Sequence, residues 1–256
     1  MITLYGMTSP NVVKIIIALE ELELPYRFEP VDVFKGENFR PEFLALNPSG
    51  KVPVIVDEDG PGDEPTTPGW SFSFEFGEQT KRPYTVFESG AILLYLAEKT
   101  GRLLPKGGRA RYDALQWLMV QLTGVGPMFG QFVHFTRFGP KGEGGDYAVS
   151  RYRTQVVRLC ELLEARLAEQ PYLAGPDYSI ADVATVPWSR TLPMLLGEDA
   201  AAAYPKLAEW TRTVCARPAV ARAIARVDEL RATLTPFDKA EPETLDRMFG
   251  RGTYAA

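Results

Sequence analysis

The sequence predicts an N-terminal α/β domain followed by an all-helical C-terminal domain. Over the first hundred residues, short β-branched runs alternate with stretches of helical periodicity, whereas beyond residue 108 the apolar periodicity is helical. The stretch 101–108 contains glycine and proline and is typical of a linker between domains. A chain of 256 residues is long enough for two modest domains.

The expected order of elements in the N-terminal domain, 1–100, is β-α-β-α-β-β-α. Strands are predicted at 2–5, 26–33, 54–56 and 84–87, helices from residue 10 and from residue 89, and a short helix or turn at 39–46. Ser9 and Pro10 provide an N-cap and an N1 proline for the first helix. The run 91–96 fits a helix or a strand, and its continuation through Lys99 favours a helix. Since a helix joins the first two strands, they should be parallel, and the order as a whole is thioredoxin-like.

The stretch 47–56 combines a turn with a buried strand. Residues 47–50 (NPSG) have the composition of a turn, and 54–56 are β-branched and apolar. Pro53 stands between them and is a candidate for a cis peptide bond. The backbone N–H and C=O of Val52 would then be free to pair with an extended peptide ligand.

Two segments depart from this regular pattern. The insertion 57–84 is polar and rich in glycine and proline, and within it Phe72, Phe74 and Phe76 alternate with polar residues. It fits either a hairpin arm with one aromatic face or a strand lining a partner surface. The C-terminal tail, 236–256, is polar and fits either a disordered end or a segment that wraps a neighbour.

The helical domain, 109–235, is expected to contain five helices. They are predicted at 109–135, 147–169, 180–195, 206–216 and 219–234. Ser179 and Asp182 have the spacing of a capping box at the start of the third helix, which favours a structural role for Asp182 over a catalytic one.

Composition argues against several classes of function. The net charge of −5 gives no sign of a nucleic-acid-binding face, and no apolar run approaches the length of a membrane span. The N-terminus enters a strand pattern without a signal sequence, so we expect a cytoplasmic protein. His134 is the only histidine, which excludes a multi-histidine metal site, and no metal is expected. Cys160 and Cys215 form no CxxC motif and are interpreted as core residues of helices.

Three motifs in this order resemble those of the glutathione transferase superfamily: the 47–53 turn, the stretch 87–92 (FESGAI) and the Ser179–Asp182 capping box within a helical half. The resemblance extends over residues 1–235. The finer pattern looks most like the bacterial nu class and its Ure2-like relatives, in the stretches 9–11 (SPN), 39–43 (FRPEF), 87–101 and 126–131 (GPMFGQ). This resemblance implies the glutathione transferase fold and an activity of glutathione-dependent disulfide reduction, with weak conjugating activity. The longer insertion at 57–84 departs from the class and puts in doubt the second-substrate pocket and the dimer contacts.

The resemblance also implies which residues receive the γ-glutamyl and cysteinyl parts of glutathione. Val52, which precedes Pro53, would pair through its backbone with the cysteinyl unit. Glu88 would bind the γ-glutamyl ammonium group as an ion pair. The backbone amide of Ser89, at a helix N-terminus, would bind the γ-glutamyl carboxylate with help from the helix dipole.

Further residues would complete the site. Lys51 would meet the glycyl carboxylate, and Asn38 is a weaker candidate for the same end of the ligand. Gln131 and Arg151, from the helical half, match nu-like positions, and Arg137 matches them less well.

The glutathione thiolate should lie at the N-terminus of the first helix. The Ser9 hydroxyl and the Asn11 side-chain amide are donors there, and each charge-assisted hydrogen bond contributes about 1.5–3 kcal/mol. Since one pKa unit corresponds to about 1.4 kcal/mol, two donors are enough to bring the pKa of the thiol near neutrality. Tyr5, which could mimic a catalytic tyrosine of animal classes, and Thr8 are the alternatives.

These residues predict an enzyme that uses bound glutathione, and not a protein cysteine, to reduce a disulfide. The second reading is conjugation of glutathione to a small electrophile, with Phe129, Phe132, Phe135 and Trp117 either lining an apolar pocket or forming helix core. The third is a non-catalytic glutathione-binding regulatory protein. The resemblance implies a homodimer, with glutathione and a small disulfide or electrophile as partners.

Overall fold

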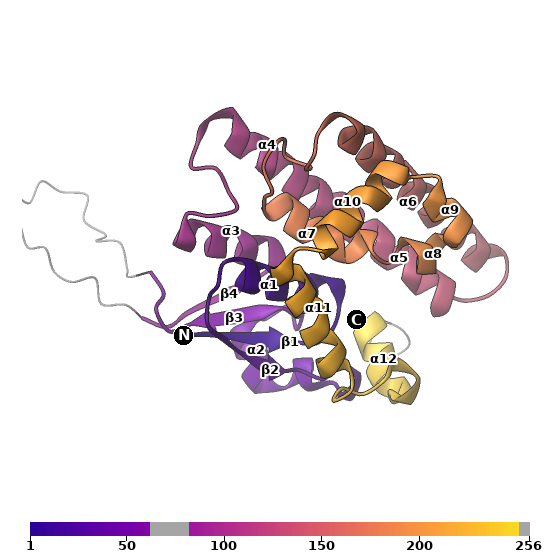
Figure 1. Cartoon of the computed structure of the whole chain (residues 1–256). Coiled ribbons are helices and arrows are strands. Elements are labelled where there is room, and N and C mark those ends of the chain that lie inside the picture. Colours follow the sequence, from indigo (N-terminus) through magenta and orange to yellow (C-terminus); the bar gives the residue numbers. More distant parts are fainter. Residues whose placement is uncertain (62–81, 251–256) are drawn as a thin grey trace, which may run out of the picture. The chain divides into compact units, whose positions relative to one another are not determined.

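The computed structural model describes residues 1–61 and 82–250 (Figure 1). They fall into two compact units, which are built from interleaved segments of the chain. The first unit comprises the described residues of Met1–Met7, Leu24–Glu88 and Leu234–Ala256, and the second comprises Thr8–Glu23 and Ser89–Thr233. The helices Pro10–Glu21 and Ser89–Thr100 therefore belong to the second unit. The domain limits 1–100 and 109–235 remain a prediction.

A four-stranded mixed sheet forms the centre of the first unit. Its strands are β1 (Ile2–Gly6), β2 (Tyr26–Pro30), β3 (Val54–Asp57) and β4 (Tyr84–Phe87), in the order β2-β1-β3-β4. The pair β1–β2 is parallel, as predicted, and the pairs β1–β3 and β3–β4 are antiparallel. The prediction of a strand continuing to residue 33 was wrong. β2 ends at Pro30 because Asp32 caps a 3₁₀ helix, its carboxylate accepting a hydrogen bond from the Phe34 amide at 3.2 Å.

Short helices complete the first unit. They are the 3₁₀ helices η1 (Val33–Lys35), η2 (Glu37–Phe39) and η4 (Phe237–Lys239), and the α-helices α2 (Pro41–Leu46) and α12 (Pro242–Phe249). Val31, Phe43 and Val54 form a buried apolar cluster, against which Tyr5 and Val52 pack. Described residues of the tail thus form helical turns, so the tail up to Gly250 is not the disordered end that was one expectation.

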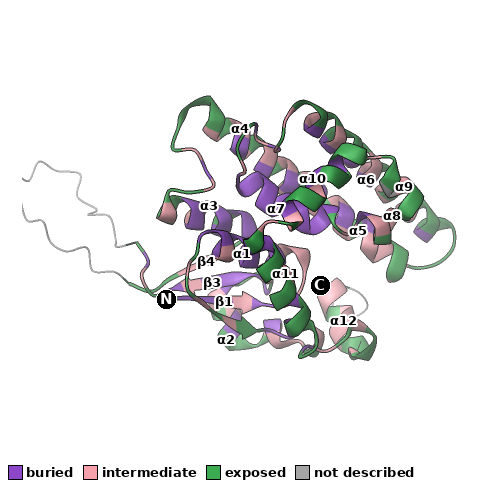
Figure 2. Cartoon of the chain, viewed as in Figure 1, coloured by how far each residue is buried: buried purple, intermediate pink, exposed green. Residues whose placement is uncertain are grey.

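The second unit is helical. Its elements are α1 (Pro10–Glu21), α3 (Ser89–Thr100), α4 (Gly108–Met119), the π-helix η3 (Val120–Val125), α5 (Gly126–Arg137), α6 (Glu143–Glu169), α7 (Ile180–Ser189), α8 (Leu192–Leu196), α9 (Glu198–Ala202), α10 (Pro205–Cys215) and α11 (Pro218–Arg231). All ten residues of α7 are buried (Figure 2), because α1, α3, α4 and α10 pack around it. The predicted capping box is confirmed: the Ser179 amide donates to the Asp182 carboxylate at 3.0 Å, and the Ser179 hydroxyl accepts from the Ala181 amide.

Two predicted helices are interrupted at prolines. The helix expected at 109–135 is divided by the π-helix, because Pro127 has no N–H for the carbonyl four residues earlier. The helix expected at 180–195 breaks after Ser189 for the same reason, since Pro193 cannot donate to the Ser189 carbonyl. None of the helices within residues 1–61 and 82–250 is long and apolar enough to cross a membrane.

The ends of the predicted insertion are described. β3 includes Asp57 and β4 begins at Tyr84, and the Gly60 amide donates to the Arg82 carbonyl at 3.2 Å. The two ends therefore lie side by side in the first unit. Phe72, Phe74 and Phe76, on which the expectation of an aromatic arm rests, lie outside the described residues.

Candidate functional site

In the first unit, the turn before β3 is shaped by Asn47. Its Oδ1 accepts from the Ser49 amide at 3.0 Å, and its Nδ2 donates to the Lys51 carbonyl at 2.7 Å. Gly50 has a φ of 63°, in the left-handed region that glycine adopts readily. The turn delivers the chain to the Val52–Pro53 peptide bond, which is cis, as the sequence suggested. No backbone hydrogen bond joins Val52 to another described residue.

Sheet register brings Glu88 beside this turn. In the antiparallel pair β3–β4, Val54 lies opposite Phe87, so the next residue on each side places Glu88 opposite Pro53. Glu88 is exposed and has a φ of 67°, a conformation that a non-glycine residue rarely adopts. Such an outlier at the end of an edge strand is the kind of feature that clusters at binding sites.

Asn38 and Lys51 flank the turn differently, because Asn38 is buried beneath it and Lys51 is exposed on it. The Asn38 side chain is buried, and its Nδ2 donates to the Gly50 carbonyl at 2.8 Å, whereas its Oδ1 has no hydrogen-bond partner among the described residues. The Lys51 side chain is exposed. Among the candidates in this unit, Asn38 therefore supports the turn from inside, and Lys51 presents a cation to solvent.

In the second unit, Ser9 occupies the N-cap position of α1, as predicted. Its carbonyl accepts from the amides of Val12 and Val13 at 2.9 Å each, but its hydroxyl makes no capping hydrogen bond. A serine in this position usually satisfies an orphan amide of the first turn with its hydroxyl. Here the Ser9 hydroxyl and the Asn11 side chain are half-exposed donors at the positive end of a twelve-residue helix.

One residue of α1 was missed by sequence reasoning. Lys14 is fully buried, and its Nζ donates to Oε1 of Gln121, in the π-helix, at 2.9 Å. Its ammonium group therefore lies inside the second unit, one turn after Asn11 on the same helix. A lysine within the apolar run 12–19 was the available signal, because buried lysines are rare and are held by polar partners.

The remaining candidates of the second unit lie on three other helices. Ser89 is buried at the N-terminus of α3, whereas Gln131 on α5 and Arg151 on α6 are exposed. α3 packs against α1, and α5 against α6. No hydrogen bond or ion pair within the described part of the chain joins Gln131 or Arg151 to Ser9 or Asn11.

The protein's own thiols are unsuited to nucleophilic attack. Cys160 is buried, and desolvation raises the pKa of its thiol to about 12, with a smaller contribution from Glu161. Desolvation also raises the pKa of Cys215, and Arg190 opposes the shift. Both cysteines are unpaired. Within the described part of the chain, no group of His, Cys, Asp and Glu side chains is arranged to hold a metal ion.

A thioredoxin-like order of elements, a turn leading into a cis-proline, and a helical half with a capped central helix together define the glutathione transferase fold. Comparison with protein families agrees. Residues 8–99 match the glutathione S-transferase N-terminal domain, and residues 125–218 match the glutathione S-transferase C-terminal domain. The chain belongs to the glutathione S-transferase family.

Individual relatives narrow the comparison. The chain is 42% identical over 226 residues to the disulfide-bond oxidoreductase YfcG of Escherichia coli, an alignment that covers 88% of this chain and 95% of YfcG. A glutathione transferase family member from Pseudomonas fluorescens, solved with two glutathione molecules bound, has a TM-score of 0.75 at 37% identity and covers 87% of this chain and 92% of its own. A glutathione transferase from Pseudomonas putida, solved with one glutathione disulfide per subunit, has a TM-score of 0.75 at 34% identity, with 87% and 90% covered.

Proposed function

We propose that this protein is a glutathione-dependent disulfide reductase in which the attacking sulfur belongs to bound glutathione. The observation that carries the proposal is the Ser9 hydroxyl, which stands at the N-terminus of α1 without capping it. A thiolate placed there would receive hydrogen bonds from Ser9 and Asn11 and would lie at the positive end of the helix dipole. The resemblance to a disulfide-bond oxidoreductase at 42% identity, and to a structure that holds glutathione disulfide, supports the same chemistry.

Within the first unit, the turn and the end of β4 suit the peptide part of glutathione. Val52 would pair with the cysteinyl backbone through its unbonded N–H and C=O. The Glu88 carboxylate would bind the γ-glutamyl ammonium, and the Ser89 amide the γ-glutamyl carboxylate. Lys51 would bind the glycyl carboxylate. Gln131 and Arg151 would contact the second substrate or a second glutathione.

The reaction would proceed as two thiol–disulfide exchanges. Glutathione, having lost its proton, attacks one sulfur of the substrate disulfide, so that a glutathionyl mixed disulfide forms and the first substrate thiolate leaves. A second glutathione thiolate then attacks the glutathionyl sulfur, which gives glutathione disulfide and releases the second substrate thiolate. The two leaving thiolates take up the two protons that the glutathiones lost. Two electrons pass from two glutathiones to one disulfide, and no protein thiol is oxidised.

The test is the turnover of hydroxyethyl disulfide by the purified protein with glutathione. We expect a rate well above the protein-free background, and a value of kcat/KM lowered about 10- to 100-fold by Ser9→Ala or Asn11→Ala, the loss of one charge-assisted hydrogen bond. Thr213→Ala is the matched control, because Thr213 is exposed and its hydroxyl donates to the Glu209 carbonyl of its own helix, at 2.9 Å. Full activity in both site variants would show that the sulfur binds elsewhere.

Conjugation to an electrophile is less well supported. It needs an apolar second pocket, and two of the side chains considered for it, Phe129 and Phe132, are buried at 1% and 5% exposure. Phe129 also packs edge-on against Trp188, with ring centroids 6.2 Å apart. These two aromatics are therefore core residues. A purely regulatory role would not require donors at Ser9 and Asn11 that lower the pKa of the glutathione thiol.

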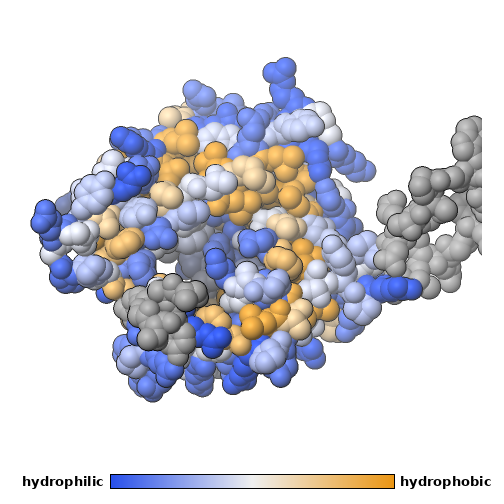
Figure 3. Space-filling view, turned by 180° about the vertical axis from the view of Figure 1, so that it is seen from behind, coloured by the Kyte–Doolittle hydropathy of each residue, from blue (hydrophilic) through white to orange (hydrophobic). Residues whose placement is uncertain are grey.

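The protein is proposed to act as a cytoplasmic homodimer. Its two unpaired cysteines suit a reducing compartment. Large apolar side chains are exposed within each unit: Tyr84 and Phe87 on the edge strand β4, and Tyr112 and Met119 on α4. Figure 3 shows hydrophobic residues gathered in patches among hydrophilic ones on one face of the molecule. Exposed patches of this kind mark protein interfaces.

A further inference from the structure

The C-terminal part of the first unit packs on the loop that supports the glutathione-binding turn. This part, 234–249, contains η4 and α12 and lies outside both regions that match the glutathione S-transferase domains. α12 contacts η1, and both elements belong to the first unit. We call residues 234–249 the C-terminal strap and residues 32–39 the strap loop.

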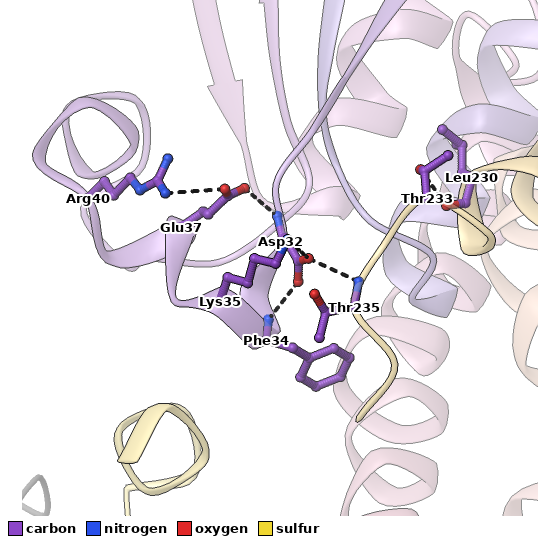
Figure 4. A network of polar contacts seen from close by, with 8 residues as sticks. All are labelled: Asp32, Phe34, Lys35, Glu37, Arg40, Leu230, Thr233 and Thr235. Atoms are coloured by element: carbon purple, nitrogen blue, oxygen red, sulfur yellow. Dashed lines mark hydrogen bonds and ion pairs between the residues drawn. The ribbon is translucent and has the colours of Figure 1, made fainter. Parts of the chain in front are cut away.

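A buried carboxylate ties the strap to the strap loop. Asp32 is 5% exposed, and its Oδ2 accepts a hydrogen bond from the Thr235 amide at 3.0 Å while its Oδ1 accepts from the Phe34 amide (Figure 4). The Asp32 amide in turn donates to the Glu37 carboxylate at 2.8 Å. One carboxylate therefore caps η1 and fixes the point where the strap begins.

Side chains of the strap then cover the loop at three further points. The Phe237 ring meets the Phe34 ring edge-on, with centroids 5.5 Å apart. The Arg247 guanidinium lies 4.2 Å from the centroid of the Phe39 ring, in a cation–π contact. The Thr244 methyl group lies 3.7 Å from the place where a Cβ would stand on Gly36, which has a φ of 72°.

The strap loop also contacts the glutathione-binding turn. Cδ1 of the Phe39 ring lies 3.6 Å from the Cβ position of Gly50, on the ring whose face Arg247 covers. The neighbouring residue, Asn38, donates to the Gly50 carbonyl at 2.8 Å. Lys51 follows Gly50 directly, so the position of its backbone depends on the Asn38 side-chain amide and on the Phe39 ring that Arg247 of the strap covers.

We propose that the strap positions the part of the site that binds the glycyl end of the substrate, with Arg247 and Phe39 as positioning residues. The inference rests on the proposed function, in which Lys51 receives the glycyl carboxylate. The strap would then set the preference for the tripeptide glutathione over γ-glutamylcysteine, a dipeptide that shares the thiol and the γ-glutamyl group but has no glycyl residue.

The test compares Arg247→Ala with Arg247→Lys and with the control Arg226→Ala. Arg226 is exposed on α11, in the second unit, and pairs with Glu229 of the same helix at 3.0 Å, so its loss removes a similar surface charge from a residue that is not part of the strap. We expect Arg247→Ala to raise KM for glutathione about two- to fivefold, the loss of an exposed cation–π contact, with kcat unchanged and KM for γ-glutamylcysteine unchanged. Arg247→Lys keeps a cation over the ring, so its KM for glutathione should stay close to the wild-type value.

Hydrogen exchange without any ligand separates this inference from the proposed function. In Arg247→Ala, amides of 33–51 should exchange faster than in the wild type and in Arg226→Ala. Unchanged exchange, or an equal rise in KM for both thiols, would overturn the positioning role. A third outcome is that Arg247→Ala exchanges faster but the wild type binds glutathione and γ-glutamylcysteine equally well. That outcome would contradict the glycyl contact of Lys51, and with it the specificity that we assign to the strap.

Discussion

At the scale of single residues, Asp182 shows why a buried carboxylate need not be catalytic. Its Oδ1 accepts from the Leu173 amide and from Nε1 of Trp210, both at 3.0 Å, and its Oδ2 accepts from the amide and the hydroxyl of Ser179. These donors lower the pKa of the carboxyl, but desolvation is the larger effect and raises it from 3.8 to about 6. All the donors come from elements that Asp182 holds together.

Asp182→Ala should therefore destabilise the fold. We expect the free energy of unfolding in urea to fall by about 3–5 kcal/mol, since buried donors lose their acceptor. Asp177→Ala, at an exposed position, is the control. Because the folded pKa lies above the unfolded one, the folded state holds the proton more tightly, and the stability that Asp182 contributes declines as pH rises from about 4 to about 6. The difference between wild type and Asp182→Ala should accordingly shrink by about 1 kcal/mol between pH 5 and pH 7.

The two cysteines give a second prediction at this scale. With the pKa of Cys160 raised to about 12, almost none of this thiol is ionised at pH 7. The double variant Cys160→Ala, Cys215→Ala should keep kcat/KM for the disulfide within about twofold of the wild type. A large loss of turnover in a variant that remains folded by circular dichroism would revive a mechanism with a protein thiol.

At the scale of elements, the start of α6 contains two neighbouring glycines in different surroundings. A Cβ on Gly145 would clash with the Pro140 carbonyl oxygen, whereas a Cβ on Gly144 would meet nothing within 4 Å. The α5–α6 connection therefore approaches the first turn of α6 so closely that only glycine fits at one of the two positions.

Alanine substitutions at these glycines should act in opposite directions. Gly144→Ala should raise the free energy of unfolding by about 0.5–1 kcal/mol, because alanine has the higher helix propensity. Gly145→Ala should lower it by about 1–3 kcal/mol, because the backbone must shift. Urea denaturation of both variants and the wild type measures the two values, and equal effects of either sign would contradict the close approach.

The elements also show what local sequence can predict. The order of strands and helices, the parallel first pair and the Ser179–Asp182 capping box follow from periodicity and capping chemistry, which act over a few residues. The π-helix and the break after α7 were not predicted, although the sequence contains Pro127 and Pro193 near them. A proline predicts that one hydrogen bond is lost, but how the chain responds depends on what packs against the helix.

At the scale of the whole molecule, the missed features are contacts between residues far apart in the sequence. Lys14 and Gln121 are 107 residues apart, and Asp32 and Thr235 are 203 apart. No periodicity relates such pairs, so neither the partner of Lys14 nor the packing of the strap could be predicted. The candidate site is divided in the same way: its turn and its helix N-terminus could each be identified from a motif, whereas Asn38 owes its supporting role to a hydrogen bond across twelve residues.

The proposed homodimer gives the prediction for the intact protein. On α4, Tyr112 and Met119 are 66% and 42% exposed, and their spacing of seven residues places them on one face of the helix. Exposed apolar faces of this kind commonly mark protein interfaces, so we expect the wild type to sediment with twice the mass of the 28.5 kDa chain.

Charges on that face should separate the subunits. The double variant Tyr112→Glu, Met119→Glu would bring four carboxylates into a two-fold interface, where like charges that lose water repel strongly. We expect it to sediment as a monomer at micromolar concentration, whereas Tyr147→Glu, at a 69% exposed position on α6, should remain a dimer. A monomeric wild type, or a dimeric double variant, would contradict the assignment of this face. Since the proposed glutathione receivers Ser9, Asn11, Lys51 and Glu88 all belong to one chain, the monomer should still bind glutathione, and calorimetry on the variant measures whether binding needs the partner subunit.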